Sequence, residues 1–189
     1  MIVNIAQWLQ EEPRGVRQTL RTGVFVWLSM VVFTVCVAGS ISVIAVLLGV
    51  DTTDALRHFG MFLDPTEELQ YFKITPSLDS IVHLSIAAPL EELLFRALPL
   101  LLVIVLVTKR LSGVITVAVL SSGVFGWLHG GWGYVPFYGM IGLILSALFL
   151  KCGGMRGAFE KPYLVASLTH LAINLTNLAY DALLLMLVR

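Results

Sequence analysis

Two long stretches of this chain contain no Asp, Glu, Lys or Arg. They cover residues 22–50 and 111–150, which are 29 and 40 residues long. An α-helix rises about 1.5 Å per residue, so about 20 apolar residues are enough to cross the hydrocarbon core of a bilayer. The first stretch therefore predicts one membrane span. The second predicts two, divided by the glycine-rich turn at residues 129–133.

The overall composition also indicates a membrane protein. Hydrophobic residues make up 58% of the 189 residues, charged residues make up 13%, and the mean hydropathy is +0.90. This is more apolar surface than one soluble core of that size can bury. The formal net charge is zero, which gives no indication of a nucleic-acid partner. We therefore expect an integral, multi-pass membrane protein that has the lipid bilayer as its partner.

The predicted fold class is all-α, as a single domain over residues 1–189 with about five transmembrane helices. Pro89 and Pro99 are expected to kink the second span, and Pro162 suits the first turn of the fifth. The five expected spans are residues 22–50, about 80–108, 112–129, 134–150 and 162–188.

The placement of basic residues gives an independent check on five spans. Cytoplasmic loops are enriched in Lys and Arg. With the N-terminus in the cytoplasm, that side receives eight basic residues and the opposite side three. The eight are Arg14, Arg17, Arg21, Lys109, Arg110, Lys151, Arg156 and Lys161, and the three are Arg57, Lys73 and Arg189. We therefore expect a cytoplasmic N-terminus.

Short interfacial helices are expected outside the spans. Apolar residues at helical spacing from Ile2 to Leu9 favour a short helix on the membrane surface, and a frayed terminus is the alternative. In the acidic segment 51–79, a helix start is predicted at Asp64. The cysteines Cys36 and Cys152 have no spacing typical of a disulfide framework or a zinc site.

Three charged residues interrupt the second predicted span. Glu91, Glu92 and Arg96 oppose membrane insertion by up to about 10 kcal/mol if nothing compensates them. Glu92 and Arg96 are four residues apart, so they can pair on one helix face. Glu91 is turned about 100° away and is the better candidate for a general base. The alternative is a buried ion network that serves packing alone.

Two further polar sets lie in the third and fifth spans. His129 follows Phe125 by four residues, so the aromatic ring can form a wall beside the imidazole. His170 and Asn174 have the same spacing, and both can donate hydrogen bonds to an oxyanion. Taken singly, His129 also fits an interfacial histidine, and the pair in the fifth span also fits polar contacts between helices.

These three sets, in this order and in separate spans, resemble the CPBP intramembrane proteases. That family includes the type II CAAX prenyl endopeptidases and bacterial Abi proteins linked to bacteriocin processing or immunity. The resemblance rests on Glu-Glu-x-x-x-Arg, Phe-x-x-x-His and His-x-x-x-Asn and covers about residues 80–180. Many members have Gly where this chain has Ala97, a difference that removes no functional group.

The resemblance implies an enzyme that hydrolyses a peptide bond of a membrane-associated peptide or protein, such as a prenylated or leader-peptide substrate. Carried onto this sequence, Glu91 would activate water with help from His129, and Glu92 and Arg96 would support Glu91. His170 and Asn174 would stabilise the oxyanion. No cofactor is expected to be required.

Two alternatives stay open at the level of the sequence. The first is a zinc-dependent form of the same protease, for which Glu91, His129 and His170 are the candidate ligands. The second is a membrane protein without turnover, such as a binding or bacteriocin-immunity protein or a small transporter with a proton relay. Retention of the complete polar set favours hydrolysis.

Overall fold

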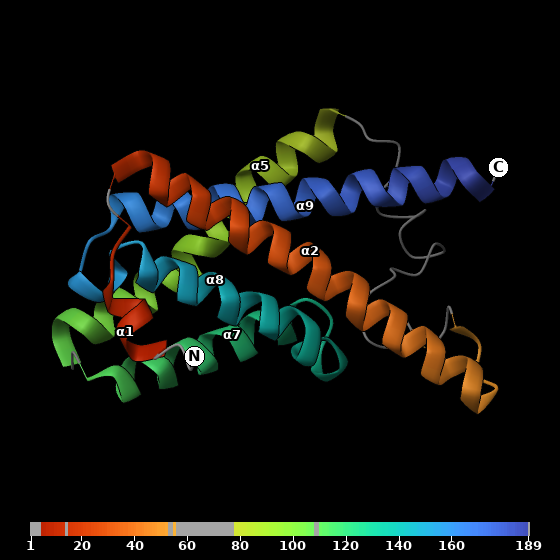
Figure 1. Ribbon diagram of the computed structural model, residues 1–189, viewed down its shortest axis with the longest axis horizontal. Helices are drawn as coiled ribbons and strands as arrows, with labels where there is room; N and C mark the ends of the chain where they lie inside the picture. The colour runs from red at the N-terminus through yellow and green to blue at the C-terminus, as the bar shows by residue number, and fades with distance from the viewer. Residues whose placement is uncertain (1–4, 14, 53–54, 56–77, 108–109, 189) are drawn as a thin grey trace.

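The computed structural model describes residues 5–13, 15–52, 55, 78–107 and 110–188. Every regular element within these ranges is a helix, which confirms the predicted all-α class (Figure 1). The long elements are α2 (Gly15–Leu48), α7 (Leu111–Leu128), α8 (Met140–Lys151) and α9 (Glu160–Val188). A broken helix consists of α5 (Leu78–Glu92), η1 (Leu93–Ala97), α6 (Leu98–Leu102) and η2 (Val103–Val107). The short elements are α1 (Ile5–Gln10), η3 (Trp132–Tyr134), η4 (Val135–Gly139) and η5 (Gly154–Arg156).

Three helical segments of the described chain are long and apolar enough to cross a membrane. They are Gly15–Leu48, Leu111–Leu128 and Trp132–Lys151. These segments correspond to the first, third and fourth predicted spans. The second and fifth predicted spans coincide with the broken helix 78–107 and with α9, which are helical but are not among the three.

Helix α2 exposes large apolar side chains on its outer surface. Phe25 is 69% exposed, Val46 69% and Leu47 78%. A soluble protein rarely exposes so continuous an apolar surface. Together with the three apolar helices, this surface is typical of an integral membrane protein.

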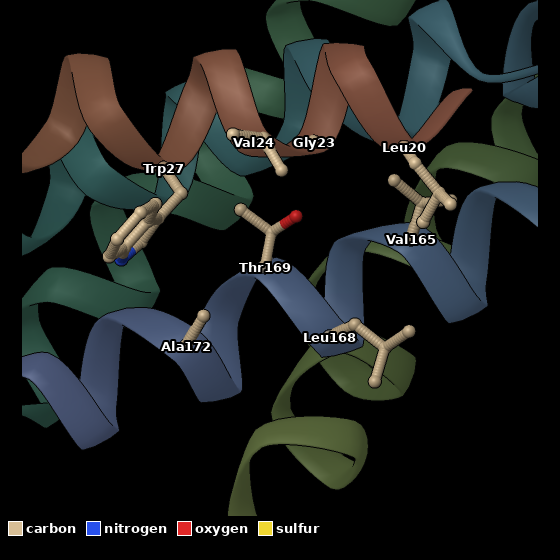
Figure 2. Close-up of a pocket in the computed structure, with 8 residues that line it drawn as sticks. All are labelled: Leu20, Gly23, Val24, Trp27, Val165, Leu168, Thr169 and Ala172. Atoms are coloured by element: carbon tan, nitrogen blue, oxygen red, sulfur yellow. The ribbon is translucent and has the colours of Figure 1, made fainter. Parts of the chain in front are cut away.

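Helices α2 and α9 pack against each other near their N-terminal halves and diverge toward their C-terminal ends (Figure 1). Gly23 allows the close approach, because a Cβ there would lie 3.2 Å from Thr169 Oγ1. Trp27 Nε1 donates a hydrogen bond to Thr176 Oγ1 at 3.1 Å. Figure 2 shows the shallow apolar groove between these two helices, from Leu20 to Trp27.

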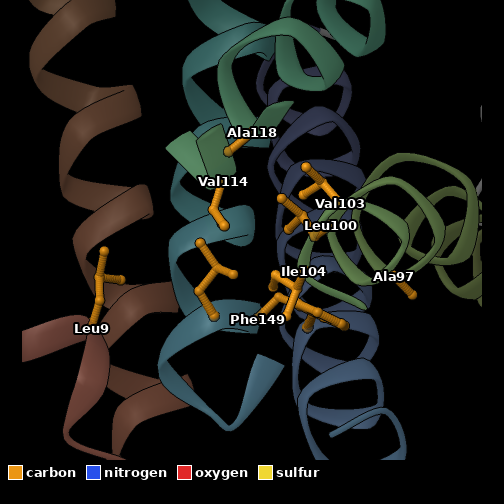
Figure 3. Close-up of a cluster of buried hydrophobic side chains, with 10 residues drawn as sticks. Leu9, Ala97, Leu100, Val103, Ile104, Val114, Ala118 and Phe149 are labelled. Carbon is orange, nitrogen blue, oxygen red and sulfur yellow. The ribbon is translucent and has the colours of Figure 1, made fainter. Parts of the chain in front are cut away.

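An apolar core joins the broken helix to the α7–α8 hairpin. Leu100, Val114 and Phe149 are fully buried there, and Leu9 of α1 belongs to the same cluster (Figure 3). Helix α1 confirms the predicted N-terminal helix, but Leu9 is only 6% exposed and packs on protein. The helix start predicted at Asp64 lies outside the described residues.

The two prolines of the second predicted span coincide with irregular helix. Pro89 lies inside α5, and Pro99 lies in the first turn of α6. Between them, Leu98 N–H donates to Leu93 O, five residues back, which is the hydrogen bond of a π-helix. Such π segments are frequent at functional sites, and this one directly follows Glu91 and Glu92.

Candidate active site

Four side chains from the broken helix and α9 form one continuous series of polar contacts. Arg96 Nη1 lies 3.1 Å from Glu92 Oε1, and His170 Nδ1 lies 2.8 Å from the same oxygen. His170 Nε2 lies 3.5 Å from Glu91 Oε2. The predicted pair of Glu92 and Arg96 is therefore present. His170 stands between the two carboxylates, a contact that the sequence did not indicate.

Glu91 is the accessible member of this series. Its side chain is 30% exposed, whereas those of Glu92 and Arg96 are 0% exposed and that of His170 is 4% exposed. This agrees with the expectation that Glu91 and Glu92 point in different directions on the helix. A water molecule or a substrate can reach Glu91, while the other three groups are covered.

Gly142 leaves room for the buried guanidinium of Arg96. A Cβ at Gly142 would lie 2.9 Å from Arg96 Nη2 and 3.2 Å from Phe125 Cδ1, so glycine provides the space. Arg96 Cζ lies 4.1 Å from the centre of the Phe125 ring, in a cation–π contact. The ion pair is thus enclosed by α8 on one side and α7 on the other.

Backbone carbonyls near the two prolines bind side chains of neighbouring helices. Pro99 has no N–H to donate to Phe95 O, and the Ser121 hydroxyl of α7 donates to this oxygen instead. The Tyr163 hydroxyl of α9 donates to Pro89 O at 3.2 Å. These two bonds fix the irregular helix, and hence Glu91 and Glu92, against α7 and α9.

His129 lies at the C-terminal end of α7, with its ring beside the series. Its Nδ1 lies 2.7 Å from Phe125 O, and since a carbonyl only accepts, Nδ1 carries the proton and Nε2 has the lone pair. The Phe125 and His129 ring centres are 4.3 Å apart, as the spacing predicted. The same Phe125 ring also contacts His170, with ring centres 5.9 Å apart, and Arg96.

Asn174 lies one helical turn beyond His170 on α9 and is half-buried. Within the described residues it makes no hydrogen bond. The structure therefore brings Glu91, Glu92, Arg96 and His170 into contact and places His129 beside them. Asn174 is aligned with His170 along one helix face without joining the series.

The inner side of the site has unused hydrogen-bonding capacity. Glu92 Oε2, Arg96 Nε and Nη2 and Ser167 Oγ are buried and have no hydrogen-bond partner among the described protein atoms. Buried polar groups in proteins are normally satisfied, often by ordered water.

The proposed zinc ligands do not form a metal-binding group in the described part of the chain. No three His, Cys, Asp or Glu side chains there are arranged to hold an ion. His170 Nδ1 is directed to Glu92, so a metal at Glu91, His129 and His170 could use only its Nε2. The residues present do not fit a three-ligand zinc site in this arrangement.

Several side chains that surround the series were not predicted from the sequence. Ser121 and Tyr163 could have been sought from the two prolines, because each proline disturbs the hydrogen bonding of the helix around it. Tyr138 stacks on His129 with ring centres 4.6 Å apart. No sequence signal linked Tyr138 or Gly142 to the site, since both contacts depend on how α7 and α8 pack.

The fold and the site together define an all-helical membrane protein that contains a largely buried series of acidic and basic side chains. Residues 73–176 match the family described as Type II CAAX prenyl endopeptidase Rce1-like. This match covers more than half of the chain and all three polar sets, and the chain therefore belongs to that family. No curated protein and no solved structure matches the chain.

Proposed function

We propose that this protein is an intramembrane endopeptidase that hydrolyses a peptide bond of a membrane-associated substrate, with Glu91 as the general base. Membership of the endopeptidase family supports proteolysis. The observation that carries the assignment is that Glu91 alone is accessible while its partners Glu92, Arg96 and His170 are buried. Glu91 is thus the carboxylate of the series that can meet a substrate, while its charged partners are covered.

In the proposed reaction, the Glu91 carboxylate takes a proton from water, and the hydroxide equivalent attacks the carbonyl carbon of the scissile bond. His129 Nε2, which has the lone pair, orients that water. The tetrahedral oxyanion accepts hydrogen bonds from the Asn174 amide and from Nε2–H of His170 in its imidazolium form, whose Nδ1–H stays on Glu92. The C–N bond then breaks, and Glu91 returns its proton to the leaving amine.

Glu92 and Arg96 serve this reaction by holding His170. The Glu92 carboxylate binds His170 Nδ1, so Nε2 is the nitrogen that faces Glu91. Arg96 compensates the charge of Glu92 at a depth where an unpaired carboxylate is costly. Phe125 covers the Arg96 guanidinium in a cation–π contact.

Five membrane crossings are part of this proposal, with the N-terminus in the cytoplasm. The broken helix 78–107 and α9 would cross in addition to the three apolar helices. Glu92 lies near the middle of residues 78–107, so the reaction would take place at bilayer depth. The eight-to-three distribution of basic residues supports the orientation.

The test is cleavage by purified protein in detergent with a panel of membrane-bound peptides, prenylated and non-prenylated. Wild type should cleave at least one of them. Glu91→Gln should lower kcat by at least 100-fold without changing the elution profile. Glu160→Gln, an exposed carboxylate at the start of α9, is the matched control and should cleave normally. If wild type leaves every peptide intact, or if Glu91→Gln cleaves like wild type, the proposal fails.

The same assay separates the metal-free reaction from its zinc-dependent alternative. We expect activity to survive a strong zinc chelator, because the described residues do not form a three-ligand group. Complete loss of activity that only added zinc restores would assign Glu91, His129 and His170 to a metal instead.

A further inference from the structure

His129 lies at an exposed helix end, where a side chain normally samples several rotamers. It is the C-cap residue of α7, and the glycine pair Gly130 and Gly131 follows directly. One hydrogen bond, from Nδ1 to Phe125 O, attaches the ring to its own helix. A role as the group that orients water requires Nε2 to keep one direction, so the ring needs support from a second element.

That support comes from Tyr138 of η4. The Tyr138 ring is nearly parallel to the imidazole, with an interplanar angle of 20° and ring centres 4.6 Å apart. Phe125 covers the imidazole at 4.3 Å with a tilt of 55°. The imidazole is therefore enclosed by one aromatic ring from its own helix and one from the next helix.

Tyr138 is itself fixed on two sides. Tyr134 stacks on it at 5.8 Å with an angle of 22°, and Phe137 meets it edge to face at 5.4 Å. Phe125, the other ring against His129, is only 1% exposed and also lies under Arg96. The rings on both sides of His129 are therefore anchored independently of His129.

The backbone geometry of η4 explains why Tyr138 reaches His129. A Cβ at Gly126 would lie 2.7 Å from Gly139 N and 2.9 Å from Val135 Cα, so α7 and η4 touch through their backbones. This contact lies one turn before His129 on α7 and one residue after Tyr138 on η4. The π-helical turn Val135–Gly139 thus sets the distance at which the two rings stack.

We propose that Tyr138 is a positioning residue of the hydrolytic site, whose ring holds the His129 imidazole with Nε2 directed to the water that Glu91 activates. This inference rests on the proposed function. We assign this role to the ring, because the contact with His129 is face to face. Tyr138 lies outside the three polar sets that define the site in the sequence.

Three variants test this inference in the peptide-cleavage assay. Tyr138→Phe keeps the ring and should stay within twofold of wild type. Tyr138→Leu removes the stacking and should lower kcat about fivefold to tenfold, or about 1.0–1.4 kcal/mol of aromatic contact, while KM changes less than twofold. Trp132→Leu removes an exposed aromatic ring from the same turn and should behave as wild type.

A second measurement reports on the imidazole without turnover. In protein with ¹⁵N-labelled histidine, the His129 ring should show a single Nδ1–H tautomer in wild type and in Tyr138→Phe. Tyr138→Leu should show both tautomers in exchange. If wild type cleaves no peptide, the proposed hydrolysis fails, and the spectra still decide whether Tyr138 orders His129.

Three results would overturn the inference. The first is equal loss in Tyr138→Phe and Tyr138→Leu, which would transfer the role to the hydroxyl. The second is a Tyr138→Leu protein that retains wild-type kcat and a single tautomer. An increase of KM alone in Tyr138→Leu would also count against it, because that pattern indicates substrate binding.

Discussion

At the scale of single residues, the site depends on burying a charge pair inside apolar helices. Glu92 and Arg96 are both 0% exposed, and each compensates the other at 3.1 Å. Removing one partner leaves the other uncompensated, whereas removing both leaves none. We therefore expect that removing one partner destabilises the protein more than removing both.

This difference can be measured in a double-mutant cycle. Arg96→Leu should lower the free energy of unfolding by about 3–5 kcal/mol, and Glu92→Leu combined with Arg96→Leu should recover part of that loss. Unfolding in detergent mixtures, followed by circular dichroism, gives both values. Additive losses in the double variant would show that the two side chains do not stabilise each other.

Gly142 gives a second prediction at this scale. Gly142→Ala places a methyl group 2.9 Å from Arg96 Nη2, and it should lower the free energy of unfolding by about 1–3 kcal/mol and reduce peptide cleavage. Gly39→Ala is the matched control, since nothing lies within 4 Å of its Cβ and alanine favours helix. The comparison fails if both substitutions have the same effect on thermal unfolding.

At the scale of elements, a clamp of ion pairs holds the segment before α2 against η5 and the start of α9. Glu12 Oε1 lies 2.7 Å from Lys161 Nζ, and Glu12 Oε2 lies 3.3 Å from Arg156 Nη1. Lys151 Nζ donates to Trp8 O and lies 4.8 Å from the Trp8 ring centre. These contacts attach α1 to the end of the bundle at which α9 begins.

The clamp predicts a pH dependence. The hydrogen bond from Lys161, with the charges of Lys161 and Arg156, holds the pKa of Glu12 below its ordinary value of 4.5. A lowered native pKa means that the carboxylate stabilises docking fully above pH 4.5, and that this stabilisation is lost as the pH falls through the native pKa. Trp8 fluorescence should therefore change below pH 4.5 and return on neutralisation.

Glu12→Gln is the control for this titration. It lacks the ionisable group, so its Trp8 signal should resemble the acid form already at pH 7 and should not change between pH 6 and 3. An acid transition that persists unchanged in Glu12→Gln would assign the effect to another carboxylate.

At the scale of the whole molecule, the number of membrane crossings decides on which side of the membrane each turn between helices lies. Five crossings place the turn between α7 and α8 on the side opposite the N-terminus, whereas crossings by α2, α7 and α8 alone place it on the same side. The proposed site needs five, because Glu91 and His170 lie on the two remaining helices.

Single cysteines separate these cases. In a Cys36→Ser, Cys152→Ala background, Arg17→Cys and Trp132→Cys should react with an impermeant maleimide from opposite faces of sealed vesicles, since both positions are exposed. Glu160→Cys should share the face of Arg17→Cys. Labelling of Arg17→Cys and Trp132→Cys from one face would eliminate the five-span arrangement.

The sequence by itself determined the helical class and where the helices lie. Apolar stretches must form hydrogen-bonded helices in lipid, and the predicted spans 112–129 and 162–188 agree with α7 and α9 within a few residues at each end. It also indicated six candidate site residues, because polar and ionisable residues are rare at membrane depth: Glu91, Glu92, Arg96, His129, His170 and Asn174. The pairing of Glu92 with Arg96 followed from their spacing on one helix.

Only the tertiary structure decided how these groups meet. His170 contacts both carboxylates because α9 packs beside the broken helix, and Tyr138 reaches His129 because Gly126 lets η4 touch α7. Such contacts depend on separations and angles between helices, which no periodicity within one helix encodes. The predicted surface helix at the N-terminus likewise packed on protein, because Leu9 fits the core and Glu12 meets two cations.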